Sequence, residues 1–228
     1  MKTNLNLNQI QLIIFDLDGL LVDTEKTYSE GWRYALDKNH IAVPDDVINS
    51  WAGMSFQQTG AYLMKRCGSE RIYKQIRKDR EEYIYQSLYN DRIMVKPYAK
   101  ELLVYAKKNG YTIGLASSTK SKRAKAILEY HHIIEYFDFM VFGDDTKRLK
   151  PYPDPYLEVL KNANVMPSHA VALEDSMTGI QSADAAGIAV VWVPDQSMPT
   201  DIRYTPDNVF LVSHDLLAVK HILQAVRE

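Results

Sequence analysis

The sequence has very little cysteine and no long apolar run. Cys67 is the only cysteine among 228 residues, so an intramolecular disulfide is excluded, as is typical of chains from a reducing compartment. No apolar run reaches the roughly 20 residues that a membrane-spanning helix needs. Residues 1–9 are polar and rich in asparagine, without the basic start and apolar stretch of a secretory signal. We therefore expect a cytoplasmic protein that does not enter a membrane.

An excess of positive charge is also missing. Lys and Arg number 27 against 29 Asp and Glu, a net charge of −2. Binding to nucleic acid or to an anionic membrane depends on a basic surface, so we expect neither partner. With 46% apolar and 25% charged residues, the composition is that of an ordinary globular protein with one or two domains. We expect a monomer whose partner is a small molecule.

Residues 12–19 carry the most distinctive pattern. The apolar run 12–15 is typical of a parallel strand covered on both faces. Asp16 and Asp18 follow, and alternation along an extended chain would point both the same way. At about 4 Å and an effective dielectric of about 20, their repulsion is on the order of 4 kcal/mol, so one protonates or a cation lies between them. Taken alone, such a pair could also simply solvate the strand end or cap the next turn.

The remainder of the chain divides into a helical part and an alternating part. Apolar residues recur at helical spacing throughout residues 24–92, which predicts a small helical bundle. From Pro97 onward, strands and helices alternate, as in a parallel sheet flanked by helices. The predicted strands after the first cover residues 111–116, 139–142, 170–173, 188–193 and 209–212.

These patterns predict an α/β fold with a doubly wound, Rossmann-like parallel sheet and an inserted α-helical bundle that caps it. The expected domains are a core of residues 1–23 and 93–228 and a cap of residues 24–92. In such a sheet the binding crevice lies at the carboxyl ends of the strands.

Several polar residues stand at these predicted strand ends. Ser117, between a strand and a helix, could bind a phosphate or merely cap the helix, as Thr119 could. Lys150 begins a proline-stiffened loop that could aim it inward, although a lone lysine is usually solvated. Glu174 and Asp175 offer the hard oxygen ligands that Mg²⁺ requires, while Asp175 or Ser176 could also cap the next helix.

Four stretches together resemble the haloacid dehalogenase superfamily, in its phosphatase and β-phosphoglucomutase branch. Residues 16–25 read DLDGLLVDTE, residues 115–120 read LASSTK, residues 150–154 read KPYPD and residues 173–180 read LEDSMTGI. They stand in the order of the four motifs of that family and span the predicted core.

The resemblance implies a role for each matching residue. Asp16 is expected to be the nucleophile that accepts a phosphoryl group, and Asp18 the general acid/base. Ser117 would bind the phosphate, and Lys150 would neutralise the nucleophile and the phosphoryl oxygens. The implied Mg²⁺ ligands are Asp16, Asp18 through its backbone carbonyl, Glu174 directly or through water, and Asp175.

The cap sequence bears on the choice between two reactions of this family. In the mutases, a histidine lies five residues beyond the third aspartate of the first motif, where this chain has Tyr28. An arginine follows a Gly-x-Ser of the mutase cap, whereas Phe56 follows residues 53–55 here. By this resemblance we expect a phosphatase for a small phosphorylated metabolite, with a sugar phosphate as the expected substrate. A phosphosugar mutase is the alternative, because Lys65 or Arg66 could replace the arginine.

Two further classes are less consistent with the residues. A phosphorylation-sensing receiver domain shares the sheet, an acceptor aspartate and Mg²⁺, but its acceptor ends the third strand, and it has no place for a long helical insert. An inactive binding relative is disfavoured because the residues with expected catalytic roles are all present: Asp16, Asp18, Ser117, Lys150 and Asp175.

Overall fold

The computed structural model describes residues 6–51, 56–195 and 205–225. The chain forms two compact units. Unit 1 comprises Met1–Val22 and Val95–Glu228, and unit 2 comprises Asp23–Met94. Each unit is described by itself below. The functional division into a core of residues 1–23 and 93–228 and a cap of residues 24–92 stays a prediction.

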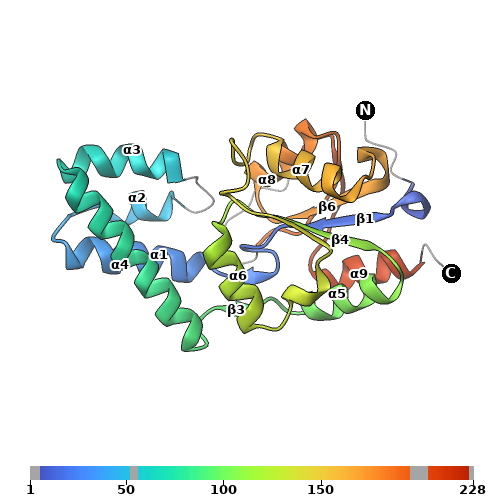
Figure 1. Ribbon diagram of the computed structural model, residues 1–228, viewed down its shortest axis with the longest axis horizontal. Coiled ribbons are helices and arrows are strands. Elements are labelled where there is room, and N and C mark those ends of the chain that lie inside the picture. Colours follow the sequence, from blue (N-terminus) through green and yellow to red (C-terminus); the bar gives the residue numbers. More distant parts are fainter. Residues whose placement is uncertain (1–5, 52–55, 196–204, 226–228) are drawn as a thin grey trace. The chain divides into compact units, whose positions relative to one another are not determined.

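Unit 1 is built on a six-stranded parallel sheet with the order β5-β4-β1-β6-β7-β8. Strand β1 is buried at all four residues, as expected for a strand covered on both faces. It lies between β4 and β6, which follow it much later in the chain (Figure 1). The strands are β1 Leu12–Phe15, β4 Thr112–Ala116, β5 Phe139–Val141, β6 Ala170–Glu174, β7 Ala189–Trp192 and β8 Val209–Val212.

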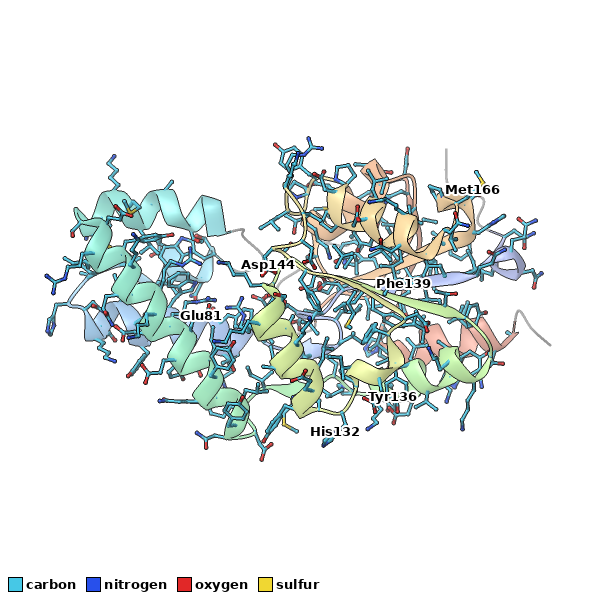
Figure 2. The ribbon with its side chains drawn as sticks, viewed as in Figure 1. Glu81, His132, Tyr136, Phe139, Asp144 and Met166 are labelled. Atoms are coloured by element: carbon cyan, nitrogen blue, oxygen red, sulfur yellow. The ribbon has the colours of Figure 1, made fainter. Side chains whose placement is uncertain are left out.

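Helices cover both faces of this sheet. Helices α7 and α8 lie on one face and α5 and α9 on the other (Figure 1), and side chains fill the space between the layers (Figure 2). The helices of unit 1 are α5 Ala99–Lys108, α6 Ser121–Tyr130, α7 Asp154–Ala163, α8 Met177–Ala185 and α9 Leu216–Ala225, with the short 3₁₀ turns η1 Leu7–Gln9, η2 Ile134–Tyr136 and η3 Pro167–His169. The predicted doubly wound α/β fold is confirmed.

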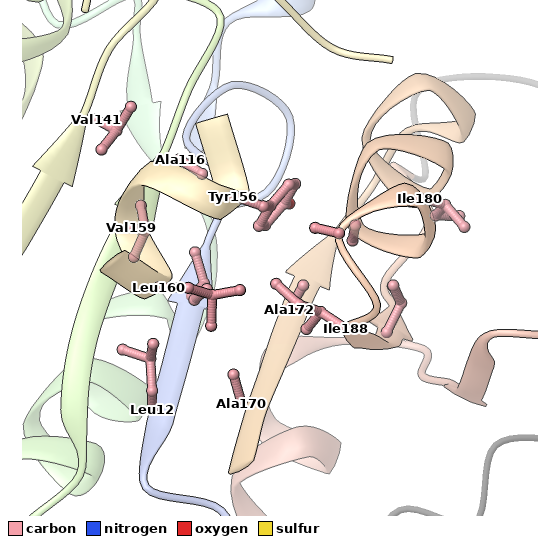
Figure 3. Packing of buried hydrophobic residues seen from close by; sticks show 14 of the residues in the cluster. Leu12, Ala116, Val141, Tyr156, Val159, Leu160, Ala170, Ala172, Ile180 and Ile188 are labelled. Carbon is pink, nitrogen blue, oxygen red and sulfur yellow. The ribbon is translucent and has the colours of Figure 1, made fainter. Parts of the chain in front are cut away.

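The core beneath α7 is formed by small and branched side chains of the sheet. Tyr156, Val159 and Leu160 of α7 pack against this face of the sheet (Figure 3). Leu12 and Ala172, from β1 and β6, belong to the same cluster. This packing holds α7 against β4, β5 and β1.

Unit 2 is helical. It contains α1 Glu25–Lys38, α2 Asp45–Asn49, α3 Phe56–Cys67 and α4 Glu70–Tyr89. Its apolar core includes Trp32, Leu36, Leu63 and Ile76, and also the thiol-bearing Cys67. Two short strands, β2 Val22–Asp23 and β3 Met94–Val95, pair with each other where the chain passes between the units. Within the described ranges, no helix has the length and apolar character needed to cross a membrane.

Candidate active site

The carboxyl ends of β1, β4 and β6 lie side by side, so the predicted site residues that follow these strands lie at the same edge of the sheet. Phe15 of β1 is in register with Leu115 of β4 and with Leu173 of β6. The residues that follow are therefore neighbours across the sheet edge. The backbone N–H of Asp16 still donates to the carbonyl of Leu173, at 3.1 Å, and that of Ser117 donates to β5 at 3.0 Å.

A buried lysine lies between two of the predicted acidic residues. Lys150 Nζ donates to Asp16 Oδ1 and to Glu174 Oε1, each at 2.5 Å. All three side chains are buried. Burial alone would lower the pKa of Lys150, but the adjacent Asp16 and Glu174 carboxylates raise it above its usual value. The lysine is therefore a permanent positive charge, and it holds the Asp16 carboxylate in a fixed position.

Glu174 is completely enclosed. Its Oε1 also accepts a hydrogen bond from the hydroxyl of Tyr156, at 2.5 Å, and its Oε2 is 3.3 Å from Ser176 Oγ. A Cβ added at Gly179 would lie about 2.0 Å from the Glu174 carboxyl group. The glycine of the fourth motif therefore leaves the space that this carboxylate occupies. Ser176 also caps α8, since its hydroxyl accepts the N–H of Gly179 at 3.1 Å.

Three carboxylates converge beside the lysine. Asp16, Glu174 and Asp175 each offer an oxygen, and these atoms lie within 4.8 Å of one another. Burial raises the pKa of Asp16 well above its usual value, and Lys150 opposes this shift. With all groups ionised, three negative charges and one positive charge leave −2, which a divalent cation would offset.

The chain also approaches this group closely after the first strand. A Cβ at Gly19, whose φ is +86°, would lie 2.1 Å from Asp175 Oδ2. The donor set consists of hard oxygen ligands only, which suits Mg²⁺. The residues present therefore fit the predicted metal, and the assignment of Asp16, Glu174 and Asp175 as its side-chain ligands stays a prediction.

The two aspartates of the first motif have different partners. Asp18 Oδ2 accepts a hydrogen bond from Thr119 Oγ1 at 2.7 Å, whereas Asp16 accepts from Lys150. The lysine lies between Asp16 and Glu174, and a proton or cation that relieves the repulsion between Asp16 and Asp18 stays a prediction. That Asp18 binds the metal through its backbone carbonyl stays a prediction.

Ser117 is fully buried at the end of β4. Its Oγ accepts the backbone N–H of Thr119 at 3.0 Å. A hydroxyl that accepts this bond keeps its own proton for a second partner, as a phosphate-binding serine requires.

No motif of the sequence identifies Tyr156 as a site residue, and the sequence indicates Thr119 only as a possible helix cap. Tyr156 lies on the buried face of α7 together with Val159 and Leu160. A buried tyrosine usually has a hydrogen-bond partner, and this rule is the one signal that could have found it. Thr119 does not serve as the cap of α6, because Lys120 occupies the N-cap position.

The site and fold can now be compared with known proteins. Residues 13–193 match the family model described as haloacid dehalogenase-like hydrolase. A phosphorylated carbohydrates phosphatase of Thermotoga maritima is 30% identical over 187 residues, which cover 80% of this chain and 84% of the relative. A β-phosphoglucomutase of Bacillus subtilis is 28% identical over 216 residues, which cover 90% of this chain and 95% of the relative.

The fold is shared with a solved β-phosphoglucomutase of Clostridium difficile. Its TM-score is 0.77 at 24% identity, with 96% of this chain and 97% of the other covered. The chain belongs to the haloacid dehalogenase-like hydrolases. The predicted family is confirmed, as is the predicted class of enzyme, a phosphomonoester hydrolase.

Proposed function

We propose that this enzyme hydrolyses the phosphate monoester of a small metabolite, a sugar phosphate, through a phosphoryl group carried by Asp16. The observation that supports it most is the buried group of Asp16, Lys150 and Glu174 with Asp175 beside it. We further propose Mg²⁺ as the cofactor, held by Asp16, Glu174, Asp175 and the backbone carbonyl of Asp18. When bound, it supplies positive charge that attracts the phosphoryl oxygens and offsets their negative charge in the transition state.

In the first half of the reaction, an oxygen of Asp16 attacks phosphorus in line with the ester bond. The new bond joins the Asp16 carboxylate to phosphorus, and the bond from phosphorus to the leaving oxygen breaks. Asp18 donates its proton to that oxygen, which departs as the alcohol. Lys150 keeps the attacking carboxylate oriented, and Ser117 donates to a phosphoryl oxygen.

In the second half, Asp18 is a carboxylate and acts as the base. It takes a proton from a water molecule whose oxygen attacks phosphorus. The bond to Asp16 breaks, and inorganic phosphate leaves. General acid/base help of this kind is typically worth about 10²- to 10⁴-fold in rate, so positioning and charge stabilisation must supply most of the acceleration.

Hydrolysis is favoured over phosphosugar mutation by the residue at position 28. Tyr28 lies on α1 where the mutases of the family have a histidine, and the guanidinium carbon of Arg80 is 5.1 Å from the centroid of its ring. The ring thus packs inside unit 2 against a cation. The run 53–55, expected to precede a mutase arginine, lies outside the described residues, as does the side chain of Phe56.

The test is phosphorus NMR of the protein with Mg²⁺ and a panel of sugar phosphates. The panel includes β-glucose 1-phosphate with a trace of the 1,6-bisphosphate, and Asp16→Asn serves as the control. Release of inorganic phosphate by the wild type alone is the expected result. Glucose 6-phosphate without free phosphate would instead identify a mutase, and no turnover of any ester would refute both reactions.

A further inference from the structure

A buried hydroxyl contacts the predicted general acid/base. Thr119 Oγ1 donates to Asp18 Oδ2 at 2.7 Å, across 101 residues of sequence. Only 5% of Thr119 is exposed, so bulk water does not compete strongly for this bond. Asp18 itself is half-buried, which leaves part of its carboxyl group open for a proton transfer.

The direction of this hydrogen bond is set by an arginine. Arg123 Nη2 lies 3.4 Å from Thr119 Oγ1, and both residues are buried. Arginine can only donate, so the threonine oxygen accepts from it and must direct its single proton elsewhere. The 2.7 Å contact to Asp18 is where that proton goes. The longer contact adds little energy by itself, but it fixes which partner donates.

Thr119 and Arg123 are held in place by their surroundings. The backbone N–H of Thr119 donates to Ser117 Oγ at 3.0 Å, and its carbonyl accepts from the N–H of Gly143 at 2.9 Å. Helix α6, which carries Arg123, is anchored at its first residue. Ser121 donates its N–H and its hydroxyl to the carboxylate of Asp144, at 2.7 and 2.8 Å. Asp144 is labelled in Figure 2 at the start of this helix.

We propose that Thr119 is a positioning residue for Asp18, and that Arg123 sets the orientation of its hydroxyl group. This inference rests on the proposed function. When Asp18 acts as the acid, Oδ2 accepts the threonine proton while Oδ1 carries the proton to be transferred. That proton goes to the leaving oxygen as the bond between this oxygen and phosphorus breaks. The hydroxyl therefore determines which carboxyl oxygen faces the substrate.

The test compares two esters that differ in their need for an acid. p-Nitrophenyl phosphate releases a stable phenolate, which needs little protonation. A sugar phosphate releases an alkoxide, which must be protonated as it leaves. The second ester is the sugar phosphate that the wild type hydrolyses fastest in the NMR panel. kcat/KM is the quantity to compare, because it reports the steps up to departure of the leaving group.

Thr119→Val removes the hydroxyl and keeps the branched shape. We expect kcat/KM for the sugar phosphate to fall about 10-fold or more, and that for p-nitrophenyl phosphate to fall less than about 3-fold. Thr119→Ser, which restores the hydroxyl, is expected to stay within about 3-fold of the wild type on both esters. In an Asp18→Asn background, Thr119→Val is expected to cost nothing further, because the group that it positions is gone.

Thr112→Val is the matched control, since it makes the same substitution at the other end of β4. Thermal unfolding shows whether each variant is folded, and Thr119→Ala replaces Thr119→Val if the latter is not. Equal losses on both esters, or failure of Thr119→Ser to restore activity, would overturn the inference. Wild-type protein that hydrolyses neither ester would instead refute the proposed function.

Discussion

The chemistry of the site depends on a few side chains whose charges are balanced in a buried space. Asp16 is the proposed nucleophile, and a buried carboxylate is costly unless it is paired. Lys150 supplies that pairing and contacts Glu174 at the same time. The same ammonium group therefore fixes the proposed nucleophile and one proposed metal ligand, and the loss of either contact would affect both.

The hydroxyl of Tyr156 contributes to the stability of this buried group, and its contribution can be measured. Burial raises its pKa well above the usual value, so the hydroxyl stays protonated and donates to Glu174 Oε1. A hydrogen bond to a charged group contributes about 1.5–3 kcal/mol. We expect Tyr156→Phe to lower the free energy of unfolding by about that amount, measured by urea denaturation in the presence of EDTA.

The matched control for this prediction is Tyr152→Phe. Tyr152 lies in the loop before α7, is about half exposed at 52%, and packs against Arg148 through its ring. That substitution is expected to change stability by less than about 0.5 kcal/mol. Equal losses in the two variants would mean that the Tyr156 hydroxyl has no special role.

Site residues that belong to a motif could be predicted from the sequence. Their hydrogen-bond partners, which come from distant parts of the chain, could not. Asp16, Lys150 and Glu174 follow from their motifs, and the structure places the three side chains in direct contact. The contact from Thr119 to Asp18 spans 101 residues, and the one from Tyr156 to Glu174 joins a helix to a strand. Such partners depend on strand order and helix packing, which no local pattern encodes.

At the scale of elements, the buried strands were the most predictable part. The predicted strand at residues 12–15 is β1, because an unbroken apolar run of that length has few alternatives in a parallel sheet. The strand predicted at residues 111–116 begins one residue later. Tyr111 donates its backbone N–H to the carbonyl of Ala106, at 3.1 Å, and so closes the end of α5 instead of joining the sheet.

A second prediction concerns Gly179 of helix α8. In an exposed helix, replacing Gly by Ala stabilises the protein by up to about 1 kcal/mol. Here the new methyl group would lie about 2.0 Å from the Glu174 carboxyl group, so that Glu174 or α8 must move. We expect Gly179→Ala to lower both the midpoint of thermal unfolding and kcat/KM, although alanine has a higher helix propensity than glycine.

Gln181→Ala is the control, because it improves helix propensity at an exposed position of the same helix. It is expected to leave activity unchanged. A Gly179→Ala variant as stable and active as the wild type would show that the glycine is not needed to make space for Glu174.

For the whole molecule, the proposed metal site links cofactor binding to stability. A ligand that binds only the folded chain stabilises it by about 2.7 kcal/mol at 100 times its dissociation constant. For a chain of this size that corresponds to a rise in Tm of about 5–10 °C. We therefore expect saturating Mg²⁺ to raise the Tm of the wild type, relative to EDTA, by an amount of this order.

Two variants separate a specific site from a general salt effect. Asp175→Asn removes a proposed ligand and is expected to abolish the Mg²⁺-dependent rise in Tm. Asp184→Asn makes the same change at an exposed position of α8 and is expected to retain it. The same rise in both variants would place the bound ion elsewhere.

The most direct test of the central claim is to find the phosphoryl group on Asp16. We would mix the enzyme with Mg²⁺ and its best ester, quench with acid within milliseconds, and analyse the peptides by mass spectrometry. One added phosphoryl group on the peptide containing Asp16, absent in Asp16→Asn and longer-lived in Asp18→Asn, is the predicted result. Steady turnover with no phosphoryl group on that peptide, or with one on another residue, would contradict the account.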